Sequence, residues 1–143
     1  MNRTQILSAK QIQQKLNRIA WQIFESNYQE SIIIIAGISG NGFVIAQRLA
    51  SIIKEISDID VLLTKIKINK NEPFNSPIEL NIEEKDFYGK VVILADDVIN
   101  SGKTMIYGVK HFLKVPVKKI NTTALIDRKH LRFPIRTDYA GLV

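Results

Sequence analysis

The sequence predicts an α/β fold in which a mainly parallel, twisted sheet is flanked by helices. Apolar, β-branched runs alternate along the chain with segments whose apolar residues recur at helical spacing. The runs lack apolar–polar alternation, which is typical of strands covered on both faces. Polar segments rich in glycine or charge follow three of these runs. The length of 143 residues is that of one domain, and we take residues 1–143 as that domain.

The first half of the chain predicts two helices and two strands. Ser8 is a capping residue for a helix with one apolar stripe, formed by Ile12, Leu16, Ile19, Ala20, Ile23 and Phe24. The run SIIIIA at 31–36 predicts a buried strand, and the glycine-rich segment GISGNG at 37–42 follows it. A second amphipathic pattern then predicts a helix that ends near Ile56, and residues 59–68 predict the next strand.

The second half begins with a turn-rich segment, residues 69–81, which holds two of the four prolines. After it, residues 91–95 predict a strand and residues 103–113 a helix. Residues 122–126 predict a further strand, and the charged stretch DRKHLRFPIR follows it.

Composition excludes several classes of protein. The chain has no cysteine, so disulfides and thiolate metal sites are excluded. It has neither an apolar run of about 18 residues nor a secretory signal pattern at its start, and we therefore expect a cytoplasmic protein without a membrane partner. The net charge of +6 favours polyanionic partners such as phosphorylated metabolites or nucleic acid.

Three polar segments, GISGNG, ADDVINSGKT and DRKH, follow predicted parallel strands. In open parallel sheets, ligands bind beyond the carboxyl ends of the strands, so these segments are expected to converge on one site. GISGNG is not a dinucleotide fingerprint, because Ser39 occupies the place of its second glycine. SGKT is not a P-loop, because Asp97 stands where that motif requires a glycine. In a phospho-accepting receiver domain the acid pair follows the first strand, whereas in this chain it follows a later strand. This class is therefore disfavoured.

Asp96 and Asp97 are followed directly by Ser101–Thr104, a loop of hydroxyls and glycine at the expected start of a helix. Backbone N–H groups and the helix dipole at such a place attract an anion. Carboxylates accept hydrogen bonds from hydroxyls and hold hydrated Mg²⁺. A ligand with a phosphate next to vicinal hydroxyls, such as ribose 5-phosphate, satisfies both halves of the motif.

VVILADDVINSGKT resembles the phosphoribosyl pyrophosphate (PRPP) signature of type I phosphoribosyltransferases. The tail ALIDRKHLRFPIRTDYAG is similar to the matching stretch of the bifunctional pyrimidine-operon attenuator and uracil phosphoribosyltransferase family. The resemblance covers nearly the whole chain. It implies an Mg²⁺-dependent transfer of the phosphoribosyl group from PRPP to a nucleobase, preferably of the uracil type, with release of pyrophosphate. It also implies a homodimer, and RNA as a further partner.

The resemblance assigns roles to individual residues. Asp96 and Asp97 are the implied catalytic residues, which hold the ribose hydroxyls directly or through Mg²⁺. Residues 69–81 and their flanking strands, about 65–88, form a hood that closes over the site. The implied substrate-binding residues are Ile38, Ser39, Gly40 and Asn41 for the pyrophosphate, in a loop that often contains a cis peptide; Val98, Ile99, Asn100, Ser101, Gly102, Lys103 and Thr104 around the 5-phosphate; and Asp127 and Arg128 beside the base.

The chain departs from the attenuator family at one place and from the related hypoxanthine–guanine phosphoribosyltransferases at another. Members of the attenuator family usually carry Lys-Thr-Arg in the pyrophosphate loop, where this chain has Ser39, Gly40 and Asn41. Lys65, Lys67 and Lys70 of the hood are candidates to supply the missing cations. Asn100 stands where hypoxanthine–guanine phosphoribosyltransferases place an aspartate, which disfavours a purine substrate because an amide cannot act as a general base.

Two alternative functions stay open. One is a purine phosphoribosyltransferase. The other is a catalytically weak regulator that responds to PRPP or nucleotide and binds RNA through cations late in the chain, namely Lys114, Lys118, Lys119, Arg128, Lys129, Arg132 and Arg136.

Overall fold

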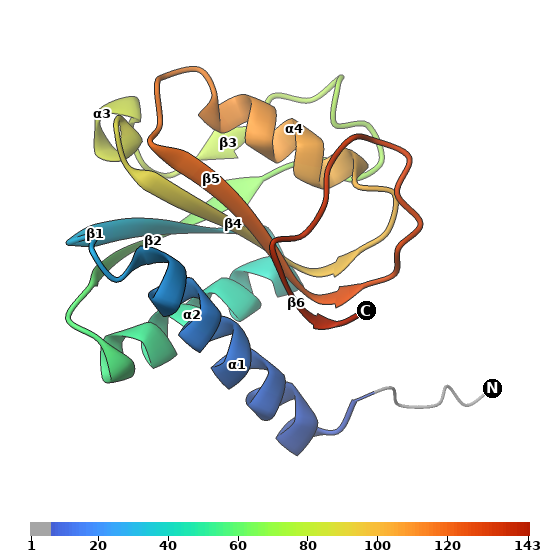
Figure 1. Cartoon of the computed structure of the whole chain (residues 1–143). Helices are drawn as coiled ribbons and strands as arrows, with labels where there is room; N and C mark the ends of the chain where they lie inside the picture. The colour runs from blue at the N-terminus through green and yellow to red at the C-terminus, as the bar shows by residue number, and fades with distance from the viewer. Residues whose placement is uncertain (1–6) are drawn as a thin grey trace.

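The computed structural model describes residues 7–143 and contains a six-stranded sheet between two layers of helices (Figure 1). The strand order is β3-β2-β1-β4-β5-β6, and all neighbouring pairs are parallel except β2 with β3. The strands are β1 (Ile32–Ile38), β2 (Asp60–Lys67), β3 (Glu79–Leu80), β4 (Val91–Ile99), β5 (Lys119–Asp127) and β6 (Tyr139–Leu142). The helices are α1 (Ala9–Asn27), α2 (Asn41–Ile56), α3 (Glu84–Phe87) and α4 (Lys103–Phe112). The predicted fold class is confirmed. Residues 1–6 of the predicted domain lie outside the described residues.

Helix α1 begins at the residue that its sequence predicts. The Ser8 side chain accepts a hydrogen bond of 3.1 Å from the Gln11 N–H, and the Gln11 side chain accepts one of 2.9 Å from the Ser8 N–H. This reciprocal capping box satisfies two donors that the first turn would otherwise leave unpaired. The predicted stripe is buried at Leu16, Ile19 and Ile23, which pack against the sheet.

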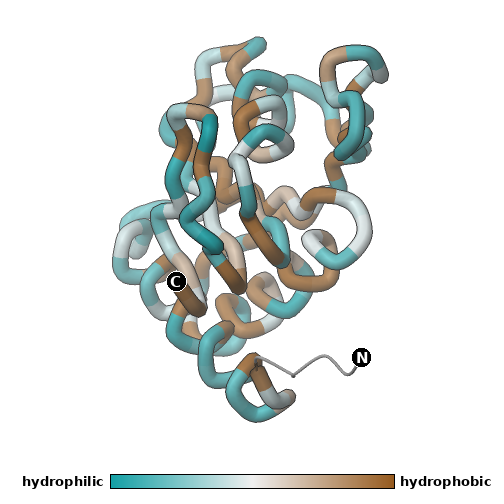
Figure 2. The backbone as a smooth tube through the Cα atoms, turned by 90° about the vertical axis from the view of Figure 1, so that its right-hand side faces the viewer, coloured by the Kyte–Doolittle hydropathy of each residue, from teal (hydrophilic) through white to brown (hydrophobic). Residues whose placement is uncertain are grey.

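Alternation along the strands divides the core into two layers. Ile33 and Ile35 of β1 face α1 and α2, whereas Ile34 and Ile38 face the layer that contains α4. All four side chains are fully buried, which explains why the sequence shows no apolar–polar alternation there. Figure 2 shows hydrophobic residues concentrated in the inner strands and polar residues in the outer loops.

The strand order creates a switch point between β1 and β4. The chain leaves β1 toward β2 on one side, and returns to β4 on the other side of β1. The loops after β1 and β4 therefore diverge at the carboxyl edge of the sheet, which is where open α/β sheets bind ligands. The loops that the sequence selects for function are the loops at this point.

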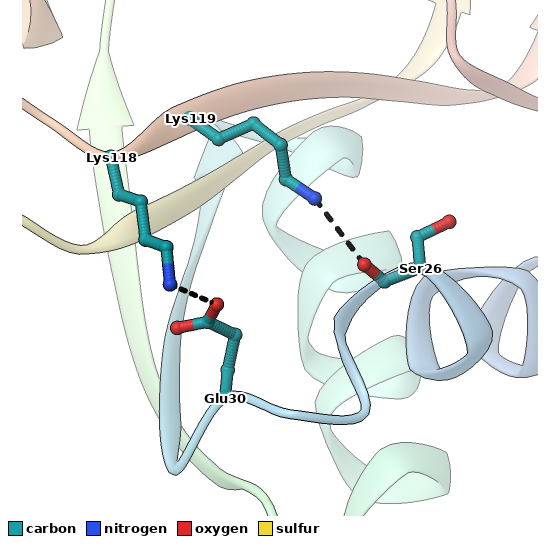
Figure 3. A network of polar contacts seen from close by, with 4 residues as sticks. All are labelled: Ser26, Glu30, Lys118 and Lys119. Carbon is teal, nitrogen blue, oxygen red and sulfur yellow. Dashed lines mark hydrogen bonds and ion pairs between the residues drawn. The ribbon is translucent and has the colours of Figure 1, made fainter.

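Ion pairs and hydrogen bonds anchor the opposite, amino-terminal edge of the sheet. Lys118 Nζ lies 2.5 Å from Glu30 Oε2, and Lys119 Nζ donates to the Ser26 carbonyl oxygen at 3.4 Å (Figure 3). These contacts tie the start of β5 to the end of α1 and to the turn that leads into β1.

Several elements differ from the sequence prediction. Strand β3 lies inside the segment predicted as turn-rich, and β5 is longer than predicted, since it starts at Lys119 and ends at Asp127. Strand β4 runs to Ile99, beyond the predicted end at Ala95, so the two acids lie inside the strand. Helix α3 is a single turn, and β6 is a short edge strand paired with β5. Both are too short to produce a periodic pattern of their own.

In the part of the chain that the structure describes, no helix has the length and hydrophobicity to span a lipid bilayer.

Candidate functional site

Residues 100–104, the loop between β4 and α4 that the sequence predicts to hold an anion, are called the cradle here. Gly102 takes the left-handed conformation at φ 86° as the N-cap of α4. An ideal Cβ at this glycine would lie 2.4 Å from Ile135 Cγ2, so both the backbone and the packing require glycine. The Ser101 Oγ accepts a hydrogen bond of 3.2 Å from the Lys103 N–H, so this N–H is already paired, whereas the Ser101 hydroxyl can still donate its proton to an anion. The next N–H groups of α4 are available to a ligand, because the first turn of a helix has no internal acceptors for them.

A cavity of about 240 Å³ opens above this cradle. Its wall includes Asp96 of β4 and Lys70 of the segment after β2. The remaining lining residues are Val98, Ile99, Asn100, Ser101, Gly102, Lys103, Thr104 and Met105. The structure thus places every residue predicted to surround the 5-phosphate in the wall of one cavity.

Asp96 and Asp97 leave β4 on opposite faces, because successive side chains in a strand alternate. Asp96 is buried and lines the cavity beside the cradle. Asp97 is half-buried and hydrogen-bonds with the side chain of Asn41 at the start of α2. The expectation of two acids together in one loop is therefore replaced by one acid on each side of the strand end, and Asp96 Oδ1 accepts a hydrogen bond of 2.9 Å from the Asp97 N–H.

The two acids differ in protonation. Burial, and next a hydrogen bond with Asp97, raise the pKa of Asp96 from 3.8 to about 7. The ammonium of Lys70, 3.5 Å from Asp96 Oδ1, only partly offsets the burial because it is itself half exposed to water. Burial also acts to raise the pKa of Asp97, but hydrogen bonds with Asp96, the Val98 backbone and Asn41 outweigh it, so this pKa lies below its ordinary value. Two neighbouring carboxyl groups with separated pKa values are typical of functional sites.

The loop after β1 approaches the acids from the other side. The Ser39 N–H donates to the Ile66 carbonyl oxygen at 2.9 Å, so it is not available to an anion. Gly40 has φ 88° and is the N-cap of α2, and the Phe43 N–H donates to the Gly40 carbonyl oxygen at 3.2 Å, which leaves the N–H groups of Asn41 and Gly42 for a ligand. Gly42 is in contact with the acid, since an ideal Cβ there would lie 2.8 Å from Asp96 Oδ1. The implied cis peptide is absent here, and all peptide bonds among residues 7–143 are trans.

Asp127 and Arg128, the residues predicted to lie beside a base, line the same cavity but differ in burial and hydrogen bonding. Asp127 is buried, and its carboxylate accepts hydrogen bonds from the Lys129 N–H at 2.9 Å and the Thr137 hydroxyl at 2.7 Å. Asp127 therefore organises the loop that follows β5. Arg128 is exposed and lines this cavity, which has a volume of about 580 Å³, with Ile126 and other residues at the carboxyl ends of β4, β5 and β6.

Sequence reasoning missed several contacts that shape the site. Ile135 packs against Gly102, Gly42 contacts Asp96, and the Arg132 N–H donates to the Ser101 carbonyl oxygen at 2.8 Å. Gly42 belongs to GISGNG and Arg132 to the candidate cations, but these contacts join segments that are distant in the sequence, and Ile135 carries no motif signal.

Comparisons with known proteins agree with this geometry. The family model described as "Phosphoribosyl transferase domain" matches residues 2–143. The chain belongs to the phosphoribosyl transferase family. It is 34% identical to "Bifunctional protein pyrR" of Enterococcus faecalis, over 99% of this chain and 83% of that protein. It is 36% identical to "Bifunctional protein PyrR" of Clostridium acetobutylicum, over 97% of this chain and 82% of that protein.

A solved structure gives the same family assignment. A hypoxanthine-guanine phosphoribosyltransferase from Bacillus anthracis superimposes with a TM-score of 0.81 and 26% identity, over 99% of this chain and 82% of that chain. The predicted resemblance to type I phosphoribosyltransferases is therefore confirmed, and the chain is a transferase of the phosphoribosyltransferase type.

Proposed function

We propose that this phosphoribosyltransferase transfers the phosphoribosyl group of PRPP to a nucleobase, with a uracil-type base preferred, and releases pyrophosphate. The observation that supports this most strongly is the cavity of about 240 Å³ that brings the cradle and Asp96 together at the switch point of the sheet. A ribose 5-phosphate carries a phosphate, which suits the cradle, and vicinal hydroxyls, which suit Asp96 beside it. The similarity to the bifunctional PyrR proteins over nearly the whole of this chain favours the pyrimidine substrate.

In this proposal the cradle binds the 5-phosphate through the first N–H groups of α4, helped by the Thr104 hydroxyl and the α4 dipole. Asp96 and Asp97 hold the ribose hydroxyls at the end of β4. The loop at 38–41 binds the pyrophosphate through the N–H groups at the start of α2. Arg128 borders the base, and Asp127 holds the loop that carries Arg128.

The residues at the site fit Mg²⁺. Asp97 is half-buried and has a lowered pKa, so its carboxylate is ionised at neutral pH. No group of three or more His, Asp or Glu side chains gathers for a metal among residues 7–143. Mg²⁺ is commonly held by one or two carboxylates, water and substrate phosphates, which this donor set can provide. When bound, Mg²⁺ would neutralise charge on the departing pyrophosphate.

The reaction would break the bond between the anomeric carbon and the pyrophosphate oxygen, and form a bond from that carbon to a ring nitrogen of the base. Positive charge develops on the ribose ring as the first bond breaks. The Asp97 carboxylate stabilises this charge from a half-buried position, where electrostatic interactions are stronger than in water. The proton of the base nitrogen leaves to solvent or to a neighbouring acceptor, so that the product is a nucleoside monophosphate and pyrophosphate.

Pyrophosphate release from PRPP and Mg²⁺, measured across a panel of pyrimidine and purine bases, tests the proposal. We expect release with uracil and little with hypoxanthine or guanine. Asp97→Asn should lower PRPP affinity, whereas Asp60→Asn, an exposed acid at the amino-terminal end of β2, should not. Release with purines alone would favour the purine alternative. PRPP affinity that is equal in wild type and Asp97→Asn would contradict the role of the acids.

A regulator that binds RNA is the second candidate, and the exposed loop after β5 favours it. Lys129, Arg132 and Arg136 of this loop are exposed, next to the cradle. Lys118 and Lys119 of the cationic set are instead engaged with Glu30 and Ser26 at the other edge of the sheet. Binding through phosphates should weaken steeply with salt. A gel shift that is absent, or that does not depend on salt, would remove this candidate.

A further inference from the structure

The loop that would bind the pyrophosphate contains no cation. Ser39, Gly40 and Asn41 offer only backbone donors, one amide and one hydroxyl, and the Ser39 N–H is already paired with Ile66. A pyrophosphate group carries several negative charges, and dipoles alone stabilise such charge less than an ammonium or guanidinium group does. The positive charge must come from another part of the chain.

Lys70 reaches the cavity from the hood. Its Nζ lies 3.5 Å from Asp96 Oδ1, and its side chain lines the same cavity as the cradle. The backbone on either side of Lys70 is held by the Asn69 side chain, which accepts hydrogen bonds from the N–H groups of Asn71 at 2.9 Å and Glu72 at 3.0 Å. The lysine therefore projects from an ordered turn.

The other two lysines of the hood lie elsewhere. The Lys65 Nζ is 4.8 Å from the centre of the Phe43 ring, in a cation–π contact. Lys65 and Lys67 line a different cavity, together with Glu79 and Leu80 of the hood and Phe43 of α2. Of the three candidate lysines, Lys70 is the one in the wall of the cavity above the cradle.

The position of Lys70 also separates it from the 5-phosphate. Asp96 is in contact with Gly42 at the start of α2, and Lys70 pairs with Asp96. The same carboxylate oxygen, Asp96 Oδ1, is therefore close both to the Lys70 ammonium and to the start of α2, which follows the loop after β1. Lys103, the second cation of the cavity wall, lies within the cradle itself and approaches the Phe74 ring at 5.7 Å.

We propose that Lys70 binds the pyrophosphate group of PRPP and takes over the role of the cations that the loop after β1 lacks. In the free protein Lys70 is paired with Asp96. On binding, the ammonium transfers to the pyrophosphate oxygens, and Asp96 becomes available to the ribose hydroxyls. The transfer requires little desolvation, because 48% of the Lys70 side chain is already exposed. This inference rests on the proposed function.

Binding of three probes to Lys70→Met and to Lys67→Met tests the inference. The probes are PRPP with Mg²⁺, inorganic pyrophosphate with Mg²⁺, and ribose 5-phosphate, which has the sugar phosphate but no pyrophosphate. We expect Lys70→Met to bind PRPP and pyrophosphate about 10- to 100-fold more weakly, as for the loss of a charge-assisted hydrogen bond, and to bind ribose 5-phosphate as wild type does. Lys67→Met, the matched control, should bind all three as wild type does, and Lys70→Arg should retain most of the affinity for PRPP.

Each contrary result has a defined meaning. Undiminished PRPP affinity in Lys70→Met would overturn the inference while leaving the proposed function intact. An equal loss of ribose 5-phosphate would also overturn it, because Lys70 would then act on the sugar phosphate. An equal effect of Lys67→Met would show a general effect of charge and likewise contradict a specific contact. If wild type binds neither PRPP nor ribose 5-phosphate, the proposed function fails, and the inference fails with it.

Discussion

Asp96→Asn should make the protein more stable above neutral pH. Asp96 is 4% exposed, and its pKa is raised from 3.8 to about 7, mainly by burial. Below pH 3.8 the carboxyl group is neutral in both the folded and the unfolded chain. Between these values only the unfolded chain is ionised, so the stability that Asp96 contributes falls as pH rises toward 7. The difference between the pKa of 3.8 in the unfolded chain and about 7 in the folded chain, at about 1.4 kcal/mol for each unit, corresponds to about 4 kcal/mol of unfolding free energy.

The amide of the variant removes the charge and keeps the shape of the side chain. Its oxygen can still accept the hydrogen bond of 2.9 Å from the Asp97 N–H. Lys70 loses its partner at little cost, because its half-exposed ammonium is hydrated. We therefore expect wild type and Asp96→Asn to be equally stable near pH 4, and the variant to be more stable by up to about 4 kcal/mol at pH 8.

Urea unfolding of both proteins at intervals from pH 4 to pH 8 measures this difference. Asp97→Asn is the matched control, since the pKa of Asp97 is lowered. The stability that the Asp97 carboxylate contributes is present above the ordinary pKa of aspartate and is lost as pH falls through the pKa in the folded chain. The Asp97→Asn variant should therefore be less stable than wild type at neutral pH. A difference between wild type and Asp96→Asn that does not change with pH, or a variant that is less stable at pH 8, would refute the reasoning.

Three further substitutions test the packing of the site. Gly102→Ala should lower the free energy of unfolding by at least about 1–2 kcal/mol, because of the left-handed backbone alone, and force Ile135 to move. It should also weaken ribose 5-phosphate binding in calorimetry, and normal binding would contradict the fit of the cradle. Gly42→Ala should displace the Asp96 carboxyl group and weaken PRPP binding about tenfold, and it should also lower the urea midpoint, because the added Cβ would lie 3.1 Å from the Ala95 carbonyl oxygen and from Asp96 Cα; unchanged affinity would mean that Asp96 does not contact the ligand. Phe87→Ala should lower the free energy of unfolding by about 3–5 kcal/mol, because this ring is 1% exposed. A loss below about 1 kcal/mol would show that α3, which carries Phe87, is not part of the core.

The predictable part of the fold depended on local signals. The capping residue Ser8 and the apolar stripe behind it are sufficient to predict α1. The continuous isoleucine run predicts a strand buried on both faces, as β1 is. Strand β6 gave no such signal, because its four residues include a glycine and pair only through their register with β5, where an ideal Cβ at Gly141 would lie 2.5 Å from the Leu125 carbonyl oxygen.

The sequence indicated which residues of one segment come together, and not their geometry. Asp96 and residues 98–104 line one cavity, whereas Asp97 lies on the other face of β4. Their roles in binding stay a prediction. The end of β4 was placed before the acids, because two adjacent carboxylates resemble a loop when only the local sequence is considered. In the folded chain the strand continues through them, paired with β5 as far as Ile99.

The sequence by itself determined which residues carry charge, which runs are apolar and where glycine permits an anion to approach the backbone. Those properties are local, and they were enough to predict the fold class and the cradle. Tertiary structure alone decided that burial raises the pKa of Asp96 to about 7 while the pKa of Asp97 is lowered, and that Lys70 is the lysine paired with Asp96. Burial and pairing depend on which segments the strand order brings together, and the free energy of a charge depends on those neighbours.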